Sequence, residues 1–193
     1  MEKVFLRFFC VVVLCAGLAV FVQTAAAKAK TDNKADKKVL VVYYSWSGNT
    51  AELAKMIQKE TDSDIFEIQT EKPYPKEYKA VTEQAKKEIN DGYKPAIKGK
   101  LKNINEYDVI FIGSPNWWGT IAPAVTAFLS EYDLSGKIVA PFFTHGGGGM
   151  QRCAADTAKL LPSSTVAQAI TFSAYSIKDS QEDVKIWVKE VLK

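Results

Sequence analysis

The stretch VVYYSWSGNT, residues 41–50, decides the fold, because a strand pattern ends in it and a helix pattern begins. Apolar and aromatic residues run from Val39 to Tyr44 and stop at the hexapeptide SWSGNT, in which serines, Gly, Asn and Thr accompany one tryptophan. Beyond it, Leu53, Met56 and Ile57 recur at the i, i+3, i+4 spacing of one helix face. The pattern predicts a buried strand, a short turn with bare backbone, and a helix.

The same alternation continues to the end of the chain. Short apolar runs are typical of parallel strands covered on both faces, and helical periodicity lies between them. The predicted strands are residues 39–44, 65–69, 109–112, 138–143 and 166–171. The predicted helices are residues 51–60, 76–90, 122–132, 150–161 and 181–192. This order predicts an α/β fold, a doubly wound five-stranded parallel sheet with helices on both faces. It leaves Pro141 unexplained, because proline cannot donate to the ladder of a central strand.

Unusual loops follow three of the predicted strands. SWSGNT (45–50) follows the first strand, GSPNWWGT (113–120) the third, and THGGGGM (144–150), with the only histidine, the fourth. In an open parallel sheet, ligands bind beyond the carboxyl ends of the strands, where the strand order reverses. With the order 2-1-3-4-5, the three loops are neighbours. The sequence therefore predicts one binding site that is built from all three.

The first loop has the chemistry of a phosphate site that lacks a cation. A helix start offers unpaired N–H groups and a partial positive charge, and Gly48 lets the backbone approach an anion closely. The loop contains no Lys or Arg, and the chain has neither GxxxxGK[ST] nor GxGxxG after the first strand. An ordinary serine-rich turn that caps the helix is the alternative interpretation.

Together the loops resemble the flavodoxin family, specifically its short-chain bacterial flavodoxin-like members. The resemblance rests on YSWSGNT, on YPKEY (74–78) and on YDVIFIGSPNWWGTIAPAVTAFLSEYDLSGKIVAPFFTHGGGG, and it extends from about residue 39 to the C-terminus. It implies a flavodoxin-like fold and a non-covalently bound FMN. It also implies that the phosphate is held by Ser45, Ser47, Gly48, Asn49 and Thr50.

The resemblance assigns the two walls of the flavin site as well. One wall along the isoalloxazine ring consists of Pro115, Asn116, Trp117, Trp118 and Gly119, with Trp117 in the stacking place. The other wall consists of Thr144, His145, Gly146 and Gly147. Trp46, which the motif does not constrain, completes the cofactor-binding candidates. Classical electron-carrier flavodoxins have an aromatic stacker and acidic residues in the last loop, and this sequence has neither.

Structural alternatives stand beside these assignments. A tryptophan face suits a flat tricyclic ring, but the tryptophans could instead be core or surface aromatics. The glycine run could be a flexible turn before a helix, and His145 a hydrogen-bonded loop residue without a redox role. We interpret Tyr74 and Tyr78, in the connection around the second helix, as packing residues.

The sequence predicts an FMN-binding electron-transfer protein, either a redox carrier or a small flavin reductase. Its partner would be a redox protein or a small-molecule electron acceptor, and an NAD(P)H:quinone oxidoreductase is one form of the reductase. A net charge of +3 without a basic stripe argues against nucleic acid. A flavodoxin fold kept as a binding module without turnover is the alternative.

The N-terminus predicts export. Lys3 and Arg7 precede an uncharged run that ends near Ala27, the layout of a signal peptide covering residues 1–27. Residues 28–38 read as a flexible tether and 39–193 as the flavodoxin-like domain. We expect a periplasmic or extracellular protein, with contact to a membrane only through an uncleaved N-terminal segment. The leader has no twin arginine, so we expect FMN to be acquired after export.

Overall fold

The computed structural model describes residues 37–193, so the predicted signal peptide and almost all of the tether lie outside the described residues. The strands are β1 (Val39–Tyr43), β2 (Asp64–Glu67), β3 (Val109–Trp117), β4 (Thr120–Ile121), β5 (Ile138–His145), β6 (Thr165–Val166) and β7 (Ile170–Ser173). The helices are α1 (Asn49–Thr61), α2 (Tyr78–Asp91), α3 (Pro123–Glu131), α4 (Cys153–Lys159) and α5 (Gln181–Leu192). Short 3-10 turns span Ile104–Glu106 and Ile177–Asp179.

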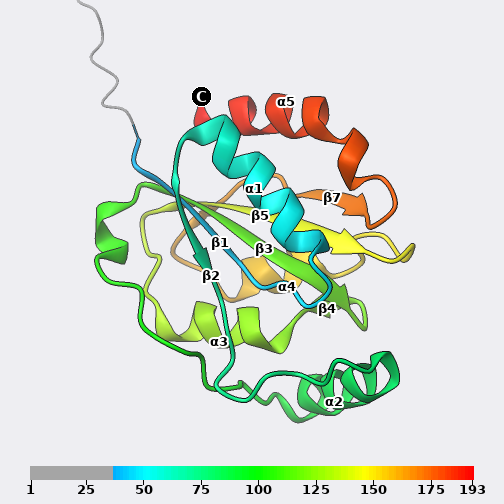
Figure 1. The fold of residues 1–193 in the computed structure, drawn as a ribbon. Coiled ribbons are helices and arrows are strands. Elements are labelled where there is room, and N and C mark those ends of the chain that lie inside the picture. Colours follow the sequence, from blue (N-terminus) through cyan, green and yellow to red (C-terminus); the bar gives the residue numbers. More distant parts are fainter. Residues whose placement is uncertain (1–36) are drawn as a thin grey trace, which may run out of the picture. The chain divides into compact units, whose positions relative to one another are not determined.

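The sheet has the predicted doubly wound order. β2, β1, β3 and β5 pair in parallel in that sequence, and β6 and β7 both pair with the far edge of β5 (Figure 1). With the short β4 left out of the count, and β6 and β7 counted as the one predicted last strand, this is the predicted order 2-1-3-4-5. It places the carboxyl ends of β1, β3 and β5 side by side.

The sheet has seven strands instead of the predicted five, partly because the last strand is split. The Val139 carbonyl accepts a hydrogen bond from the Ala167 N–H at 2.8 Å, so alternate residues of β5 face this neighbour. Pro141 faces the same way and has no N–H to donate. The interruption at residues 167–169 lies opposite it, which accounts for a proline inside a central strand.

The other additional strand corrects the interpretation of GSPNWWGT as a loop. β3 continues to Trp117, and Asn116 and Trp117 pair antiparallel with Ile121 and Thr120 of β4. Trp118 (φ 55°) and Gly119 (φ 84°) form the connection. Positive φ at both central residues defines a type I′ turn, whose twist matches that of the flanking strands.

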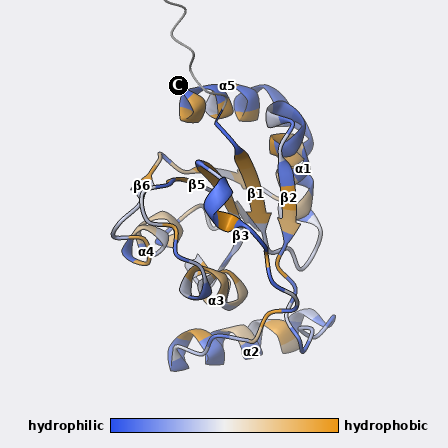
Figure 2. Cartoon of the chain, turned by 90° about the vertical axis from the view of Figure 1, so that its left-hand side faces the viewer, coloured by the Kyte–Doolittle hydropathy of each residue, from blue (hydrophilic) through white to orange (hydrophobic). Residues whose placement is uncertain are grey.

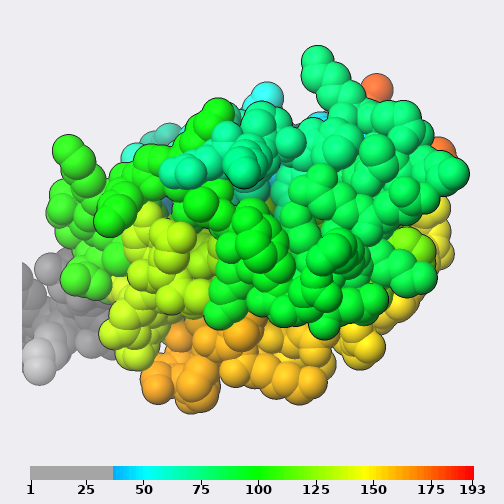
Figure 3. All heavy atoms as spheres, turned by 90° about the horizontal axis from the view of Figure 1, so that it is seen from below, coloured from blue at the N-terminus to red at the C-terminus, as the bar shows by residue number. Residues whose placement is uncertain are grey.

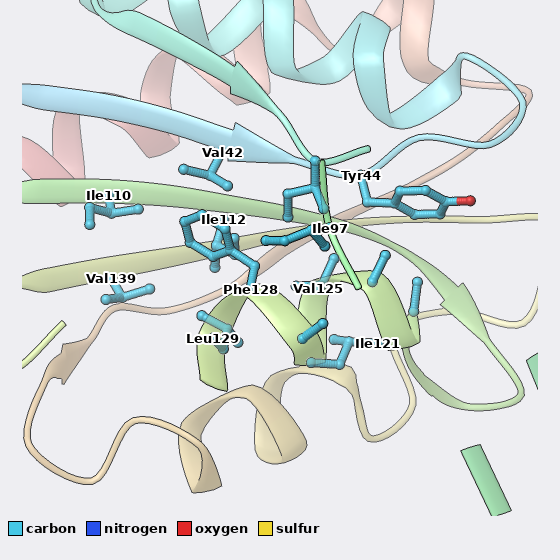
Figure 4. Packing of buried hydrophobic residues seen from close by; sticks show 14 of the residues in the cluster. Val42, Tyr44, Ile97, Ile110, Ile112, Ile121, Val125, Phe128, Leu129 and Val139 are labelled. Atoms are coloured by element: carbon cyan, nitrogen blue, oxygen red, sulfur yellow. The ribbon is translucent and has the colours of Figure 1, made fainter. Parts of the chain in front are cut away.

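Two hydrophobic layers cover the sheet. Alternate residues of β1 enter different layers: Leu40 and Val42 face α2, α3 and α4, whereas Val39 and Val41 face α1 and α5. Figure 4 shows Phe128 and Leu129 of α3 packed beneath the first of these faces. In Figure 2, β1 is hydrophobic throughout, whereas α1 mixes hydrophobic and hydrophilic residues. No helix among residues 37–193 is long and apolar enough to cross a membrane.

Candidate cofactor site

A cavity of about 460 Å³ lies beyond the carboxyl ends of β1, β3 and β5, within the size range of small-molecule sites. All three predicted loops contribute to it. The lining residues are Trp46, Ser47, Asn49, Tyr78, Val81, Thr82, Ala85, Pro115, Asn116, Trp117, Trp118, Thr144, His145, Gly146 and Ala174. The remaining sequence-predicted residues, Ser45, Gly48, Thr50, Gly119 and Gly147, lie in the same loops but do not line it.

The first loop presents unpaired donors. Gly48, at φ 92°, precedes α1 without a side-chain cap, and the first helical bond runs from the Glu52 N–H to the Gly48 carbonyl. The N–H groups of Asn49, Thr50 and Ala51 therefore have no acceptor within the helix. The Ser45 hydroxyl is buried and has no hydrogen-bond partner among the described residues. A bound anion would satisfy this set of groups.

Thr50 connects the first loop to the start of the third in the protein interior. Its side chain is buried, and its hydroxyl lies 2.8 Å from that of Thr144, with either oxygen able to donate. Asn49 donates to the Ser47 hydroxyl at 3.1 Å, which orders the exposed part of the loop. The role of Thr50 in this structure is therefore to hold the loops together.

Trp117 forms the wall of the cavity at the end of β3. It stands edge-on to Tyr44 and Tyr74, with ring centroids 5.6 Å and 5.1 Å away. Tyr74 donates its hydroxyl proton to the carboxylate of Glu88, which also accepts from Gln84 at 2.8 Å. Burial, and then the bond to Glu88, raise the pKa of the Tyr74 phenol. The orientation of Trp117 is therefore fixed by buried aromatic rings.

The two adjacent tryptophans have different surroundings. Trp118 is 52% exposed and donates its indole N–H to the Thr82 carbonyl of α2 at 2.9 Å. Asn116 fixes the turn between them, because it accepts from the Gly119 N–H at 2.9 Å and donates to the Gly149 carbonyl at 2.6 Å. The hairpin is thereby tied to α2 on one side and to the glycine run on the other.

His145 lies at the end of β5 and lines the cavity. Its Nδ1 accepts a hydrogen bond from the Gly147 N–H at 3.0 Å. A nitrogen that accepts carries no proton, so in this arrangement the imidazole proton is on Nε2. The hydrogen-bonded loop histidine that the sequence left as an alternative is therefore present, and the same side chain faces the cavity.

Sequence reasoning missed the contribution of α2. Tyr78, Val81, Thr82 and Ala85 line the cavity, and Tyr78 is 71% exposed, so its interpretation as a packing residue was wrong. Tyr74 does pack, at 7% exposure. The signal was the YPKEY motif: Trp46 of the first loop donates to the Pro75 carbonyl at 2.8 Å, and its ring lies 6.3 Å from that of Tyr78.

The site is suited to a flat, uncharged ring system with an anionic end. No Asp or Glu lines the cavity, and the described part of the chain has no cluster of three or more His, Cys, Asp or Glu side chains that could hold a metal. Cys153 offers no reactive thiolate, because burial raises its pKa to about 12. Aromatic walls and neutral donors are the chemistry that remains.

Comparison with known proteins identifies the family. The flavodoxin family model matches residues 38–191. A candidate flavoprotein from Bacteroides uniformis is 30% identical with a TM-score of 0.71, over 79% of this chain and 98% of that one. A flavoprotein from Lactobacillus acidophilus, solved in complex with FMN, is 28% identical with a TM-score of 0.64, over 76% and 99% of the two chains. No curated protein matches the chain. The chain belongs to the flavodoxin family.

Proposed function

We propose that this chain binds FMN and passes electrons between partners outside the cytoplasm. The observation that carries the proposal is the buried, unpartnered Ser45 hydroxyl beside the uncapped start of α1, in a loop that lines a cavity walled by Trp117. The FMN complex of the Lactobacillus acidophilus relative and the signal-peptide layout of residues 1–27 support it.

Different residues of the site fit different parts of FMN. Ser45, Ser47 and the N–H groups at the start of α1 would hold the phosphate, since they supply neutral donors and a helix end. Trp117 would lie along the isoalloxazine ring, the part of FMN that takes up and releases electrons. The Gly146 backbone and His145, with its proton on Nε2, would form part of the other wall.

Reconstitution tests the proposal. Protein mixed with FMN and then freed of unbound flavin should keep the flavin absorbance through cycles of chemical reduction and reoxidation. Consumption of NADH or NADPH with a quinone would identify a reductase, and its absence a carrier. Protein that retains flavin only when made without residues 1–27, and never when isolated after export, would contradict the extracytoplasmic part. Failure to retain flavin in either form would favour a binding module without redox turnover.

A further inference from the structure

The charges of the described chain are distributed unevenly. Residues 72–102 contain nine lysines and four acidic residues, whereas the rest of residues 37–193 contains eleven basic and fifteen acidic residues. This segment includes α2 and the stretch that follows it. The overall charge is thus close to balance, while one segment is strongly positive.

The lysines of this segment lie at the surface and are mostly unpaired. All nine are exposed: Lys72, Lys76, Lys79, Lys86, Lys87, Lys94, Lys98, Lys100 and Lys102. Among the described residues, only Lys79 and Lys87 form ion pairs within the segment, with Glu83 at 3.9 Å and with Asp91. The positive charge is therefore available to a partner.

The stretch after α2 folds back along the residues that precede the segment. Thr70 bridges to Ile97, and the Glu71 N–H donates to the Ala96 carbonyl at 2.8 Å, so the stretch after α2 returns beside residues 70–72. Figure 3 looks onto this side of the molecule, where the green atoms of the segment occupy much of the visible surface. We call the exposed part of residues 72–102 the basic face.

The basic face carries exposed aromatic side chains and borders the cofactor cavity. Tyr78 and Tyr93 of the face are 71% and 54% exposed, and Trp118, which borders it, is 52% exposed. Tyr78 and Trp118 line the cavity. The Lys86 ammonium lies 4.7 Å from the centre of the Trp118 ring. Exposed tyrosine and tryptophan are enriched in protein interfaces. The face therefore combines contact residues, uncompensated charge and access to the site.

We propose that the basic face is the docking surface for an acidic partner protein, placed against the cavity mouth. The acidic nature of the partner is inferred from charge complementarity, which steers proteins together over distances longer than contact. That the partner is a redox protein rests on the proposed function. A carrier with an acidic docking surface would instead attract a basic partner.

Two other anionic surfaces fit less well. The exposed side of α2 consists of Tyr78, lysines and polar residues, so it has no aliphatic stripe to enter a bilayer. Glu77, Glu83 and Asp91 lie among the lysines, where they would repel the continuous phosphates of nucleic acid. A protein surface with separated acidic side chains suits this mixed pattern.

Salt dependence tests the proposal on the FMN-loaded full chain. Reduced plant-type ferredoxin, an acidic iron–sulfur protein, serves as the probe: its cluster loses one electron and the flavin gains it. The second-order rate constant should fall about tenfold or more between about 0.01 M and about 0.15 M ionic strength, over which the Debye length shortens from about 30 Å to about 8 Å. A rate that is constant or rises with salt would overturn the proposal.

Two charge-matched double variants locate the effect. Lys76→Glu/Lys79→Glu changes the basic face next to Tyr78, and acidic residues near a helix start favour α2. Lys59→Glu/Lys189→Glu makes the same change of net charge on α1 and α5, which cover the other side of the sheet. At low salt the first variant should lose about tenfold in rate and most of its salt dependence, and the second less than about twofold. Equal losses would show that only net charge matters.

A flavin-independent measurement separates this proposal from the proposed function. Titrating oxidised ferredoxin into the isotope-labelled full chain without FMN should shift amide resonances of residues 72–102 in the NMR spectrum. These shifts support docking even if the chain never takes up flavin. Shifts confined to other residues would overturn it. A second contradicting result is binding to phosphatidylserine-rich vesicles that is stronger than binding to neutral vesicles and is lost in Lys76→Glu/Lys79→Glu. That result would assign the basic face to a lipid surface.

Discussion

At the scale of single residues, the hydrogen bond from Tyr74 to Glu88 supports the Trp117 wall. Glu88 is 8% exposed and accepts only from Tyr74 and Gln84 among the described residues. Tyr74→Phe should lower the free energy of unfolding by about 1.5–3 kcal/mol, because a buried carboxylate loses a donor. Tyr107→Phe is the matched control: its hydroxyl donates to Asp64, which is exposed. That change should cost less than about 1 kcal/mol.

Urea unfolding measures both variants, and alkaline pH adds a second readout. The folded-state pKa of Tyr74 lies above the usual value of about 10. Its contribution to stability is therefore present below about pH 10 and is lost as the pH rises, because the unfolded chain releases the proton first. Tyr74→Phe should lose less stability above pH 10 than the wild type. An unchanged alkaline profile, or equal costs for both variants, would contradict this role.

The individual site residues show what sequence can and cannot reveal. Asn49, Trp117 and His145 were predicted from their positions after strands, and they do line one cavity. Thr50 was predicted as a phosphate ligand, yet its hydroxyl is within hydrogen-bond distance of Thr144, far along the chain. A pairing between two loops depends on how deeply each side chain is buried, which no local pattern encodes. The role of Thr50 toward a phosphate stays a prediction.

At the scale of elements, the β3–β4 hairpin places both tryptophans. Its turn requires Gly119 at φ 84°, where an added Cβ would also lie 2.6 Å from the Gln151 side chain. Gly119→Ala should destabilise the protein by about 1–2 kcal/mol, the cost of a left-handed conformation for a residue with a Cβ. Gly136, at φ 75° with no atom near an added Cβ, is the matched control.

The two glycine variants separate stability from binding. Gly136→Ala should cost a similar free energy of unfolding but leave the affinity for FMN unchanged, since this turn lies outside the cavity. Gly119→Ala should weaken FMN binding as well, because the hairpin carries Trp117 and Trp118. Chemical unfolding and flavin titration of both variants provide the test. Equal FMN affinities would show that the turn does not position the wall.

The elements also show where periodicity stops being informative. Apolar runs predicted every main strand of the sheet, and helical periodicity predicted every helix that covers it. The end of β3 was taken for a loop because polar and small residues replace the apolar run there. Tertiary pairing with β4 extends the strand despite that composition. The last strand is likewise split opposite Pro141 of β5, which has no N–H to donate.

At the scale of the whole molecule, the fold brings the proposed anion site and an aromatic wall to the carboxyl ends of the strands, and the α2 part of the basic face borders them. Topology explains the first two, because the carboxyl ends of β1, β3 and β5 are adjacent. The basic face could not be predicted from the net charge, since the lysines of residues 72–102 are offset by acidic residues elsewhere. Only the folded chain shows that charge and cavity coincide.

The central claim is that the loop after β1 holds the phosphate of FMN. The two buried hydroxyls without partners among the described residues, those of Ser45 and Thr171, provide a matched pair. Ser45→Ala and Thr171→Val should each leave the flavin-free protein at least as stable, because an unsatisfied buried group is removed. Thr171 lies on β7, outside the loop after β1 that carries Ser45.

The decisive measurement is the dissociation constant of FMN and of riboflavin, which lacks the phosphate, for the wild type and these two variants. We expect Ser45→Ala to weaken FMN binding by about tenfold to a hundredfold, the loss of one hydrogen bond to a charged group, with riboflavin binding unchanged. Thr171→Val should bind both flavins as the wild type does. Equal losses for FMN and riboflavin in Ser45→Ala, or wild-type affinity for FMN, would contradict the account.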